Sequence, residues 1–428
     1  MRAADLGPVP PHDRHQSALD LFLIFAGANI VATTLQVGAA LAGEYSLGAS
    51  LGLIAAGSLV GSALVGALAP LGPRLGVPSV IAARAALGPR GAAAVALLLY
   101  LTNFAWIAVN NVIAASVCTQ ALGLAGAERL VAVALGVAAT AIVARGPRAV
   151  GLADRFAVPL MLAVGAVLTL ACLRLLAGPH GAPAVSSGPL LRGLDIVVGY
   201  QVSWLLMFAD YSRYTASERG SLLAVFLGLA LTSLWFMPIG LVAARAAGTS
   251  DPGAMLLATG IGRWGALLIT LATLTTNFVN IYLSSLAWKS LLPTTGDQLS
   301  IWSIGAIGTA LGLFSSAWLN RYADFMLALG SVLVPVGAIL LAHFFVLRRI
   351  PCVDDLYDAR GPYARHAGFS VPGVVAWIAG AAAYHLAADV GSTIASFAVA
   401  MIVYVTLDVW IRGRRSGIET TSSSTVSR

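Results

Sequence analysis

Long apolar segments recur from one end of the chain to the other and limit it to a membrane-embedded fold. Each has about 20 residues, which is the length of a helix that crosses the hydrocarbon core of a bilayer. Ala, Leu, Val and Gly dominate them, without the short alternating pattern of barrel strands. Of the 428 residues, 58% are hydrophobic and only 10% are charged. The sequence therefore predicts an all-α integral membrane protein.

Twelve segments are candidate transmembrane helices, with bounds that are predicted to within a few residues. They are 21–41, 47–70, 92–119, 127–145, 156–177, 193–214, 220–246, 262–287, 300–319, 323–347, 370–387 and 391–411. Residues 1–20 form a polar N-terminal lead, and 348–369 form the main soluble connection. The Ser/Thr-rich tail at 412–428 is predicted to be disordered.

The net charge of +7 comes from basic residues that collect in particular loops. If both ends of the chain are cytoplasmic, most of the 25 Lys and Arg residues fall on the cytoplasmic side, as the positive-inside rule requires. We therefore expect a multi-pass protein of the cytoplasmic membrane, in contact with lipid and not with nucleic acid. The clusters that carry this pattern are Arg74, Arg84 and Arg90; Arg145, Arg148 and Arg155; Arg348, Arg349, Arg360 and Arg365; and Arg412, Arg414 and Arg415.

No group of residues predicts enzyme chemistry. The cysteines, Cys118, Cys172 and Cys352, have neither disulfide nor metal-ligand spacing. The sequence contains no evident Ser/His/Asp arrangement and no Gly-rich phosphate loop. We expect a protein that is not an enzyme, that has no cofactor, and that needs no obligate protein partner.

Two of the predicted spans are interrupted by glycine and polar residues. The interruptions consist of Gly27, Asn29, Thr33, Thr34 and Gln36 in the first span and Gly199, Gln201 and Ser203 in the sixth. A break of this kind frees backbone carbonyls, which a membrane tolerates where they line a cavity or meet an ion. Close packing of small residues between helices is the alternative explanation.

The two interrupted spans are five helices apart, as in the inverted five-helix repeats of secondary transporters. The repeats would occupy 21–177 and 193–347, with helices 1 and 6 discontinuous and two additional helices at 370–411. The remaining polar features fall on spans 3 and 8. Such a fold brings spans 1, 3, 6 and 8 together at its centre.

Span 8 carries a polar stripe inside an apolar segment. Thr273, Thr276, Asn277 and Asn280 are spaced i, i+3, i+4 and i+7, so they share one face of a helix. Polar groups are costly in hydrocarbon unless they have partners, so the stripe faces protein, a cavity or an ion. Hydrogen-bonded contact between helices and a binding site are both consistent with it.

Span 3 carries a tryptophan in its middle. Trp106 lies one helical turn before Asn110, and the pair would give an aromatic wall with a hydrogen-bonding neighbour. This arrangement suits a flat polar ring. A tryptophan that is simply packed in the core is the alternative.

Two ionisable features lie within or beside the spans. Asp210 precedes Arg213 by three residues, so the two can pair locally, and we favour a structural or gating ion pair over substrate contact. His343, near the end of the tenth span, is either packed or interfacial, or else belongs to a proton relay.

These residues resemble the nucleobase:cation symporter-1 family, which includes bacterial cytosine permeases and hydantoin transporters. The resemblance covers about residues 20–385. Its signposts, in matching order and spacing, are Arg74–Arg84, Gly88–Gly91, Trp106, Ala209–Tyr214, Thr275–Asn277 and Phe344–Arg349. Some segments are also similar to carriers of hydroxymethylpyrimidine.

The resemblance implies a leucine-transporter-type fold, with a 5+5 inverted repeat and two extra C-terminal helices. It also implies a sodium site that joins backbone carbonyls of the broken first helix to a carbonyl and two hydroxyls of the eighth. The family positions fall on Gly27, Ile30, Ala272, Thr275 and Thr276. All of these ligands are neutral oxygen atoms, which suit a hard cation.

For the substrate, the resemblance implies an aromatic wall at Trp106, with Asn110 and Asn277 as amide neighbours. We expect Gln201 and Ser203 to read the edge of the ring as well, with Asn280 as a further candidate. The chain departs from the family where Gln201 replaces a stacking aromatic residue. This difference from the family affects which ring the protein would bind more than it affects the class of transporter.

We therefore expect a symporter that imports a small planar heterocycle, such as cytosine or hydroxymethylpyrimidine, together with Na⁺ by alternating access. A proton-coupled carrier of purines, hydantoin, allantoin-like compounds or amino acids on the same fold is the first alternative. A channel or a structural membrane protein is the alternative from another class.

Overall fold

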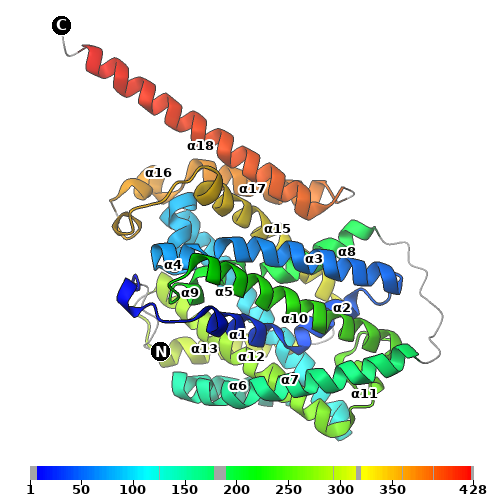
Figure 1. Ribbon diagram of the computed structural model, residues 1–428. Helices are drawn as coiled ribbons and strands as arrows, with labels where there is room; N and C mark the ends of the chain where they lie inside the picture. Colours follow the sequence, from blue (N-terminus) through cyan, green and yellow to red (C-terminus); the bar gives the residue numbers. More distant parts are fainter. Residues whose placement is uncertain are drawn as a thin grey trace.

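The computed structural model describes residues 7–124, 126–177, 189–292, 294–314, 320–358, 360–388 and 390–425, and these are almost entirely helical (Figure 1). One isolated β-bridge joins Gln16 to Thr215. The longer helices are α1 (Ala18–Asn29), α2 (Ala32–Ala40), α3 (Leu47–Leu68), α5 (Ser79–Leu122), α6 (Glu128–Ala144), α7 (Pro147–Ala177), α8 (Leu190–Val202), α10 (Glu218–Ala247), α12 (Gly262–Leu291), α13 (Asp297–Leu311), α15 (Tyr322–Leu341), α17 (Val371–Leu386) and α18 (Ser392–Thr425).

Short helices and single turns connect the long ones. They are η1 (Pro11–Asp13), α4 (Leu71–Leu75), η2 (Leu205–Met207), α9 (Phe208–Ser212), α11 (Pro252–Ala258), η3 (Gly312–Phe314), the π-helical turn η4 (Ala342–Val346), η5 (Asp354–Leu356), η6 (Pro362–Ala364) and α16 (Arg365–Gly368).

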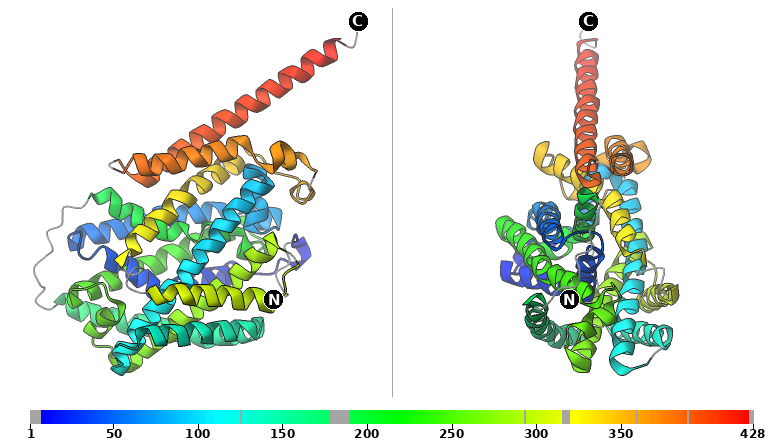
Figure 2. Two further views of the ribbon diagram at one scale, coloured as in Figure 1. Left: turned by 180° about the vertical axis from the view of Figure 1, so that it is seen from behind. Right: turned by 90° about the vertical axis from the view of Figure 1, so that its right-hand side faces the viewer.

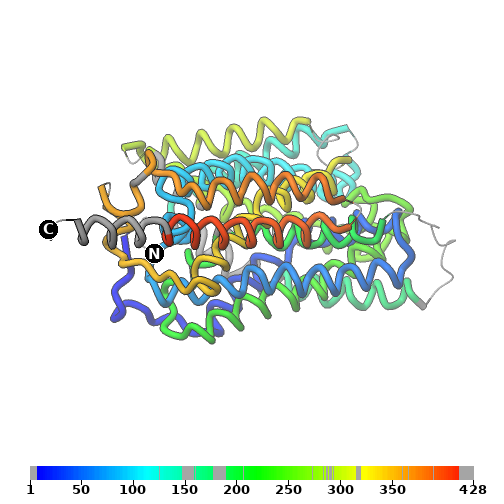
Figure 3. Tube along the Cα trace, turned by 90° about the horizontal axis from the view of Figure 1, so that it is seen from above, coloured from blue at the N-terminus to red at the C-terminus, as the bar shows by residue number. Residues whose placement is uncertain are grey.

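Most of the long helices run side by side in one bundle. In Figure 2, α17 and α18 lie on one side of the bundle, and α6 and α7 lie on the opposite side. Figure 3 shows that α18 runs along α17 toward the end of the bundle where the N-terminal segment lies.

Two groups of helices pack internally more than they pack on each other. The first contains α1, α2, α3, α8 and α10, and the second contains α5, α6, α12 and α13. The second group has an apolar cluster of its own, which includes Phe104, Ile107, Phe278 and Ile304. The two groups meet mainly where α2 contacts α5 and α12. A binding site between the two groups would therefore contain residues from both groups.

Each of the twelve segments expected to span a membrane overlaps a helix or a broken pair of helices. Within the described residues, seven helices are long and apolar enough to cross a membrane, or eight if the bent pair of α1 and α2 is one span. Of the helices outside this set, α6 has 17 residues and α13 has 15. The count of twelve spans thus stays a prediction.

Side chains that cap the helices account for several of the helix starts. Ser17 and Asp20 form a capping box at α1, in which the Asp20 N–H donates to Ser17 Oγ (3.1 Å) and the Ser17 N–H donates to Asp20 Oδ2 (3.0 Å). At α3, α10 and α11, the side chains of Ser46, Ser217 and Asp251 each accept a hydrogen bond from a backbone N–H of the first turn.

A kink at Gly88 divides α5 into a short first part and a long second part. Gly88 has φ 78°, which is left-handed, and a Cβ there would lie 2.5 Å from the carbonyl oxygen of Gly368. The first part of α5 precedes the segment at 92–119 that was predicted as the third span.

The helix α18 runs to Thr425, beyond residue 411 where the twelfth predicted span ends. The disordered tail that was expected at 412–428 stays a prediction.

The closest approach of backbones in the first helix group joins α2 to α10. A Cβ added at Gly38 would lie 1.8 Å from the carbonyl oxygen of Met237, and one added at Gly240 would lie 1.9 Å from that of Leu35. Small residues allow helices in membranes to approach this closely and to gain van der Waals contact.

We predict that Gly240→Ala lowers the melting temperature of the purified protein, because the methyl group would force α2 away from α10. The matched control is Gly52→Ala in α3, where an added Cβ meets nothing within 4 Å. Both substitutions gain about 1 kcal/mol of helix propensity. The control is therefore expected to melt at or above the temperature of the parent. Equal melting temperatures for the two variants would contradict the assigned contact.

Candidate functional site

A small cavity lies where the two helix groups meet. Its volume is about 30 Å³, enough for roughly two water molecules. A six-membered ring would enter only if side chains move aside. The cavity is lined by Ala28, Val31, Thr33, Asn103, Trp106, Asn110, Tyr200, Ser203, Trp204, Met207, Thr276, Val279 and Asn280. These residues come from the break after α1, from α5, from the break after α8 and from α12.

The wall from the second group begins with one face of α5. Asn103, Trp106 and Asn110 are spaced i, i+3 and i+7 and are all buried. The Trp106 ring makes edge contacts with Tyr200 (centroids 5.9 Å apart) and Phe325 (5.1 Å). Trp106 and Asn110 were expected in the site. Asn103 was not, although its spacing from Asn110 is the signal that could have placed it there.

The polar stripe of α12 divides between two functions. Thr276 and Asn280 line the cavity. Asn277 instead turns toward α5, where its Nδ2 donates to Asn111 Oδ1 (2.8 Å) and weakly to the Ile107 carbonyl (3.4 Å). Thr273 donates back to the carbonyl of Ile269 (2.8 Å) within its own helix. Residues that border the cavity and residues that bond to a neighbouring helix or within α12 are therefore both present in one stripe.

The break between α1 and α2 faces the cavity and is held by hydrogen bonds. The two helices are bent by 59°. Thr34 Oγ1 donates to the carbonyl of Asn29 (2.5 Å), and Tyr322 Oη donates to that of Thr33 (2.9 Å). Thr34 Oγ1 also shares a hydrogen bond with Tyr200 Oη (2.6 Å). The partners come from both sides of the break and from α8 and α15.

The break after α8 supplies the opposite side of the cavity. α8 ends at Val202, and the chain continues as single turns through η2 and α9. Ser203 lines the cavity, as expected, and its hydroxyl donates to the carbonyl of Tyr200 (2.7 Å). Tyr200, Trp204 and Met207 also line it and were not expected there.

Gln201 lies away from the cavity, in contrast to the expectation that it reads the ring. Its Nε2 donates to Ser62 Oγ (3.1 Å) and to Ser233 Oγ (2.9 Å) in the interior of the first helix group. Asn29 Nδ2 donates to the same Ser233 Oγ (2.8 Å) and to Thr232 Oγ1 (2.8 Å). The amide thus joins a polar network that links α1, α3, α8 and α10.

The residues that the resemblance assigns to sodium lie around the first break and on α12. Gly27 is in the last turns of α1, and Ile30 follows α1 with φ −83° and ψ 73°, outside the helical region. Carbonyls in the last turn of a helix have no intrahelical partner and are available to a cation. Thr275 is buried, and Thr276 borders the cavity with Ala28 and Val31.

Ala272 also lies in α12, but its side chain is outside the described residues. The donor set fits a hard cation, because carbonyl and hydroxyl oxygens are the ligands that such ions take. No cluster of three or more His, Cys, Asp or Glu residues with metal-binding geometry occurs in the described part of the chain. A cation here would therefore be held by neutral oxygens.

Asp210 and Arg213 do not line the cavity. Asp210 accepts a hydrogen bond from Ser79 at the start of α5. Arg213 Nη2 donates to Tyr214 Oη (3.0 Å), and its Nη1 donates to the carbonyl of Gly7 (3.3 Å). Both residues attach the end of α9 to neighbouring segments, as a structural role requires.

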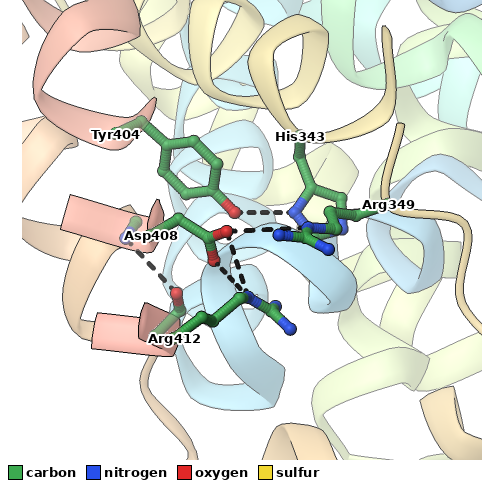
Figure 4. Close-up of polar contacts among 7 residues, drawn as sticks. His343, Arg349, Tyr404, Asp408 and Arg412 are labelled. Atoms are coloured by element: carbon green, nitrogen blue, oxygen red, sulfur yellow. Dashed lines mark hydrogen bonds and ion pairs between the residues drawn. The ribbon is translucent and has the colours of Figure 1, made fainter. Parts of the chain in front are cut away.

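His343 also lies outside the cavity, where it connects α15 to α18 (Figure 4). It is buried, and its Nδ1 shares a hydrogen bond with Tyr404 Oη (2.7 Å). One turn further along α18, Asp408 accepts from Arg412 Nε (3.0 Å) and lies 3.7 Å from Arg349 Nε. The position fits the packed alternative for His343, since this cluster fastens α18 to the end of α15.

Comparisons with known proteins agree with this fold. A family model described as permease for cytosine/purines, uracil, thiamine, allantoin matches residues 8–407. The cytosine permease of Escherichia coli (strain K12) is 26% identical over 351 residues, which cover 80% of this chain and 81% of that permease. The purine-uracil permease NCS1 of Arabidopsis thaliana is 24% identical over 430 residues, which cover 88% of this chain and 69% of that protein.

Solved structures of a nucleobase-cation-symport-1 family transporter share the arrangement of the helices. The inward facing conformation of Mhp1 matches with a TM-score of 0.84 at 18% identity, over 95% of this chain and 93% of Mhp1. At this identity the likeness establishes the fold. The family model, by contrast, spans nearly the whole chain. The protein is therefore a multi-pass integral membrane transporter, and it belongs to the nucleobase:cation symporter family of permeases for cytosine/purines, uracil, thiamine and allantoin.

Proposed function

We propose that the protein is a secondary active symporter that imports a pyrimidine-type heterocycle, such as cytosine or hydroxymethylpyrimidine, together with Na⁺. The observation that carries the proposal is the cavity itself. Trp106 and two asparagines on one face of α5 border it from one helix group, and two broken helices border it from the other. A flat aromatic surface with amides beside it suits a planar ring with polar edges.

The ring would lie against Trp106, and Asn110 and Asn280 would form hydrogen bonds with its edges. Asn103 joins them as a third amide. A site built to hydrogen-bond a polar edge rejects rings that lack it, because its own buried groups would stay unpaired. The printed names of the relatives, a cytosine permease and a purine-uracil permease, support a nucleobase as the substrate.

The coupling ion would bridge the two helix groups. The carbonyls of Gly27 and Ile30 belong to the first group, whereas the Ala272 carbonyl and the hydroxyls of Thr275 and Thr276 belong to α12 in the second. An ion bound between them would favour one relative position of the groups, and that position also sets the shape of the cavity. Binding of ion and ring would then be coupled, and the coupling is necessarily reciprocal.

Alternating access would follow from movement of one helix group against the other. The cavity is too small for a ring in the present arrangement, so a rearrangement must accompany binding. We infer twelve spans in two inverted five-helix repeats, with both termini cytoplasmic. The two broken segments, which fall five spans apart, and the grouping of the helices support this topology.

Removal of the aromatic wall is expected to weaken substrate binding. Loss of one stacking contact with a base corresponds to about 1–3 kcal/mol, or roughly 5- to 150-fold in Kd. We predict this loss for Trp106→Ala in calorimetric titrations with cytosine, and a smaller loss for Trp106→Phe, which keeps a ring. Trp264→Ala is the control, since Trp264 is 80% exposed. Unchanged affinity in Trp106→Ala would place the ring elsewhere.

Loss of the two hydroxyls is expected to remove the sodium dependence of uptake. We predict that replacing Na⁺ by choline abolishes uptake by the parent in liposomes, and that the Thr275→Ala, Thr276→Ala double variant no longer responds to Na⁺. Thr273→Val is the matched control, because that hydroxyl bonds to its own helix. It is expected to keep the response.

The same uptake assay distinguishes the proposed symporter from a proton-coupled carrier and from a channel. Undiminished uptake in choline that follows a proton gradient would identify a proton-coupled carrier. Uptake that neither saturates nor shows competition between heterocycles would identify a channel.

A further inference from the structure

A larger cavity lies between the kinked first part of α5, the connection at 348–369 and the helices α17 and α18. We call it the C-terminal cavity. Its volume is about 210 Å³, against about 30 Å³ for the cavity beside Trp106, and the two share none of their described lining residues. The residues that line the C-terminal cavity include Gly88, Tyr363, His366, Val371, Asp408 and Arg412. The proposed transport site leaves this cavity without a function.

The C-terminal cavity lies at one end of two membrane spans. The stretches that are long and apolar enough to cross a membrane run over His366–Leu386 and Ser392–Gly413. Only a few residues separate α17 from α18, and the two helices lie side by side (Figure 3). They therefore run in opposite directions, so His366 at the start of one span and Arg412 at the end of the other border the same cavity. Since the headgroups begin where a span ends, the cavity lies at their level.

The outer surface next to the C-terminal cavity is apolar. Val371 and Val375 of α17 are exposed, as are Val409 and Trp410 of α18. In a membrane such side chains contact acyl chains, and tryptophan is enriched where the hydrocarbon meets the headgroups. Val371 also lines the cavity, so the apolar surface continues into it. A ligand that uses both would be amphipathic.

The charged side chains beside this cavity leave an excess of positive charge. Arg412 Nε donates to both carboxylate oxygens of Asp408 (3.0 Å each), and Arg349 Nε lies 3.7 Å from the same carboxylate (Figure 4). One buried acid thus meets two guanidinium groups. Arg412 is 51% exposed, and no hydrogen bond or ion pair within the described residues engages its Nη atoms. These N–H groups are available to an anion.

The connection that borders the cavity from another side has an unusual backbone. His366 (φ 54°, ψ 47°) and Ala367 (φ 57°, ψ 29°) are both left-handed, and Gly368 follows at φ 80°. Residues with a Cβ rarely adopt this conformation, and such backbone is concentrated at binding sites and switch regions. The turn also packs on another basic residue, since a Cβ added at Gly368 would lie 3.1 Å from Arg90 Cγ. Arg90 therefore adds to the positive charge at this end of the bundle.

These features together fit the phosphate of a lipid headgroup. A guanidinium group binds phosphate through two parallel N–H donors, and basic pockets between helices at the cytoplasmic surface take up anionic headgroups. The acids of the connection, Asp354, Asp355 and Asp358, are not among the described lining residues, so the acidic charge at the cavity is that of Asp408. A small soluble anion would leave the adjoining apolar surface unused.

We propose that the C-terminal cavity binds the headgroup of an anionic phospholipid of the cytoplasmic leaflet. The phosphate accepts hydrogen bonds from the Nη atoms of Arg412, and the acyl chains lie on the exposed side chains of α17 and α18. The bound lipid joins α18 to the connection at 348–369, which is itself fastened to α5 where Arg84 Nη1 donates to the carbonyl of Leu356 (2.9 Å). The choice of leaflet rests on the proposed topology, whereas the identity of the transported ring has no bearing on this site.

Native mass spectrometry of the full-length protein in detergent measures this binding directly. The protein is freed of copurified lipid and titrated with dioleoylphosphatidylglycerol or with dioleoylphosphatidylcholine, which has the same chains and no net charge. The parent is expected to bind the first molecule of phosphatidylglycerol at least about fivefold more tightly than phosphatidylcholine. Fivefold corresponds to about 1 kcal/mol, the contribution of one basic side chain near an anionic surface.

Arg412→Gln is expected to remove most of this preference, because it removes the guanidinium N–H groups. The change also leaves Asp408 with fewer partners, which can loosen α18. The double variant Asp408→Asn, Arg412→Gln removes both charges together and is expected to give the same loss. Arg219→Gln is the matched control, since Arg219 is exposed at the start of α10, at the end of the bundle where Thr215 pairs with Gln16. It is expected to keep the preference, and melting temperatures without lipid check the folding of all variants.

Sodium phosphate in place of lipid distinguishes a headgroup from a free anion. Phosphatidylglycerol is expected to raise the melting temperature of the parent but not that of Arg412→Gln. Sodium phosphate is expected to change neither, because it makes no contact with the apolar surface.

Equal affinity of the parent for the two lipids would overturn the proposal. So would a preference that persists in both Arg412 variants, an equal loss in Arg219→Gln, or a melting temperature that sodium phosphate raises as much as the lipid does. Titration with cytosine reports on the proposed function separately, because the two cavities share none of their described lining residues. A parent that binds cytosine but has no preference between the lipids therefore leaves the proposed function standing and contradicts this inference alone.

Discussion

Every backbone N–H and carbonyl inside a membrane must find a partner within the protein, and this constraint governs how the helices can be broken. At the first break, the carbonyls of Asn29 and Thr33 are not left to lipid. Thr34 bonds to one and Tyr322, from α15, bonds to the other. The break is therefore stable only where helices that are distant in the chain pack against it. It fixes α1, α2, α8 and α15 around one point.

The same requirement explains why polar side chains gather in the interior. Asn29 and Gln201 both donate to Ser233 Oγ inside the first helix group, while Asn277 donates to Asn111 inside the second. Each group is held together by its own polar contacts as well as by apolar packing. Between the groups lie amides without partners, of which Asn103 and Asn110 border the cavity. Amides without partners at the border of the cavity are groups that a polar ligand could pair with.

Some of these features could be predicted from the sequence, and others could not. The helical class follows from composition, and the two interruptions were predicted from the local spacing of glycine and polar residues. The family follows from the resemblance of several motifs, in order and spacing, to a known family. The orientation of Gln201 could not be predicted, since it depends on Ser62 of α3 and on the closeness of Gly61. The partner of His343 lies 61 residues away on α18, so no local pattern could identify it. Asn103 was within reach, because it shares the helical face of Trp106 and Asn110.

The four polar residues of α12 show how one stripe can hold its helix in place and also border the cavity. Thr273 and Asn277 donate hydrogen bonds within the second helix group, to the carbonyl of Ile269 and to Asn111 Oδ1. Thr276 and Asn280, on the other side of the stripe, reach the cavity. The first pair anchors the helix, and the second pair can therefore be held at a fixed place relative to α5. A cation at Thr276 and a ring near Asn280 would lie one helical turn apart on that anchored helix. Both would contact the broken segments of the other group, so a movement that brings the groups together would strengthen the binding of each.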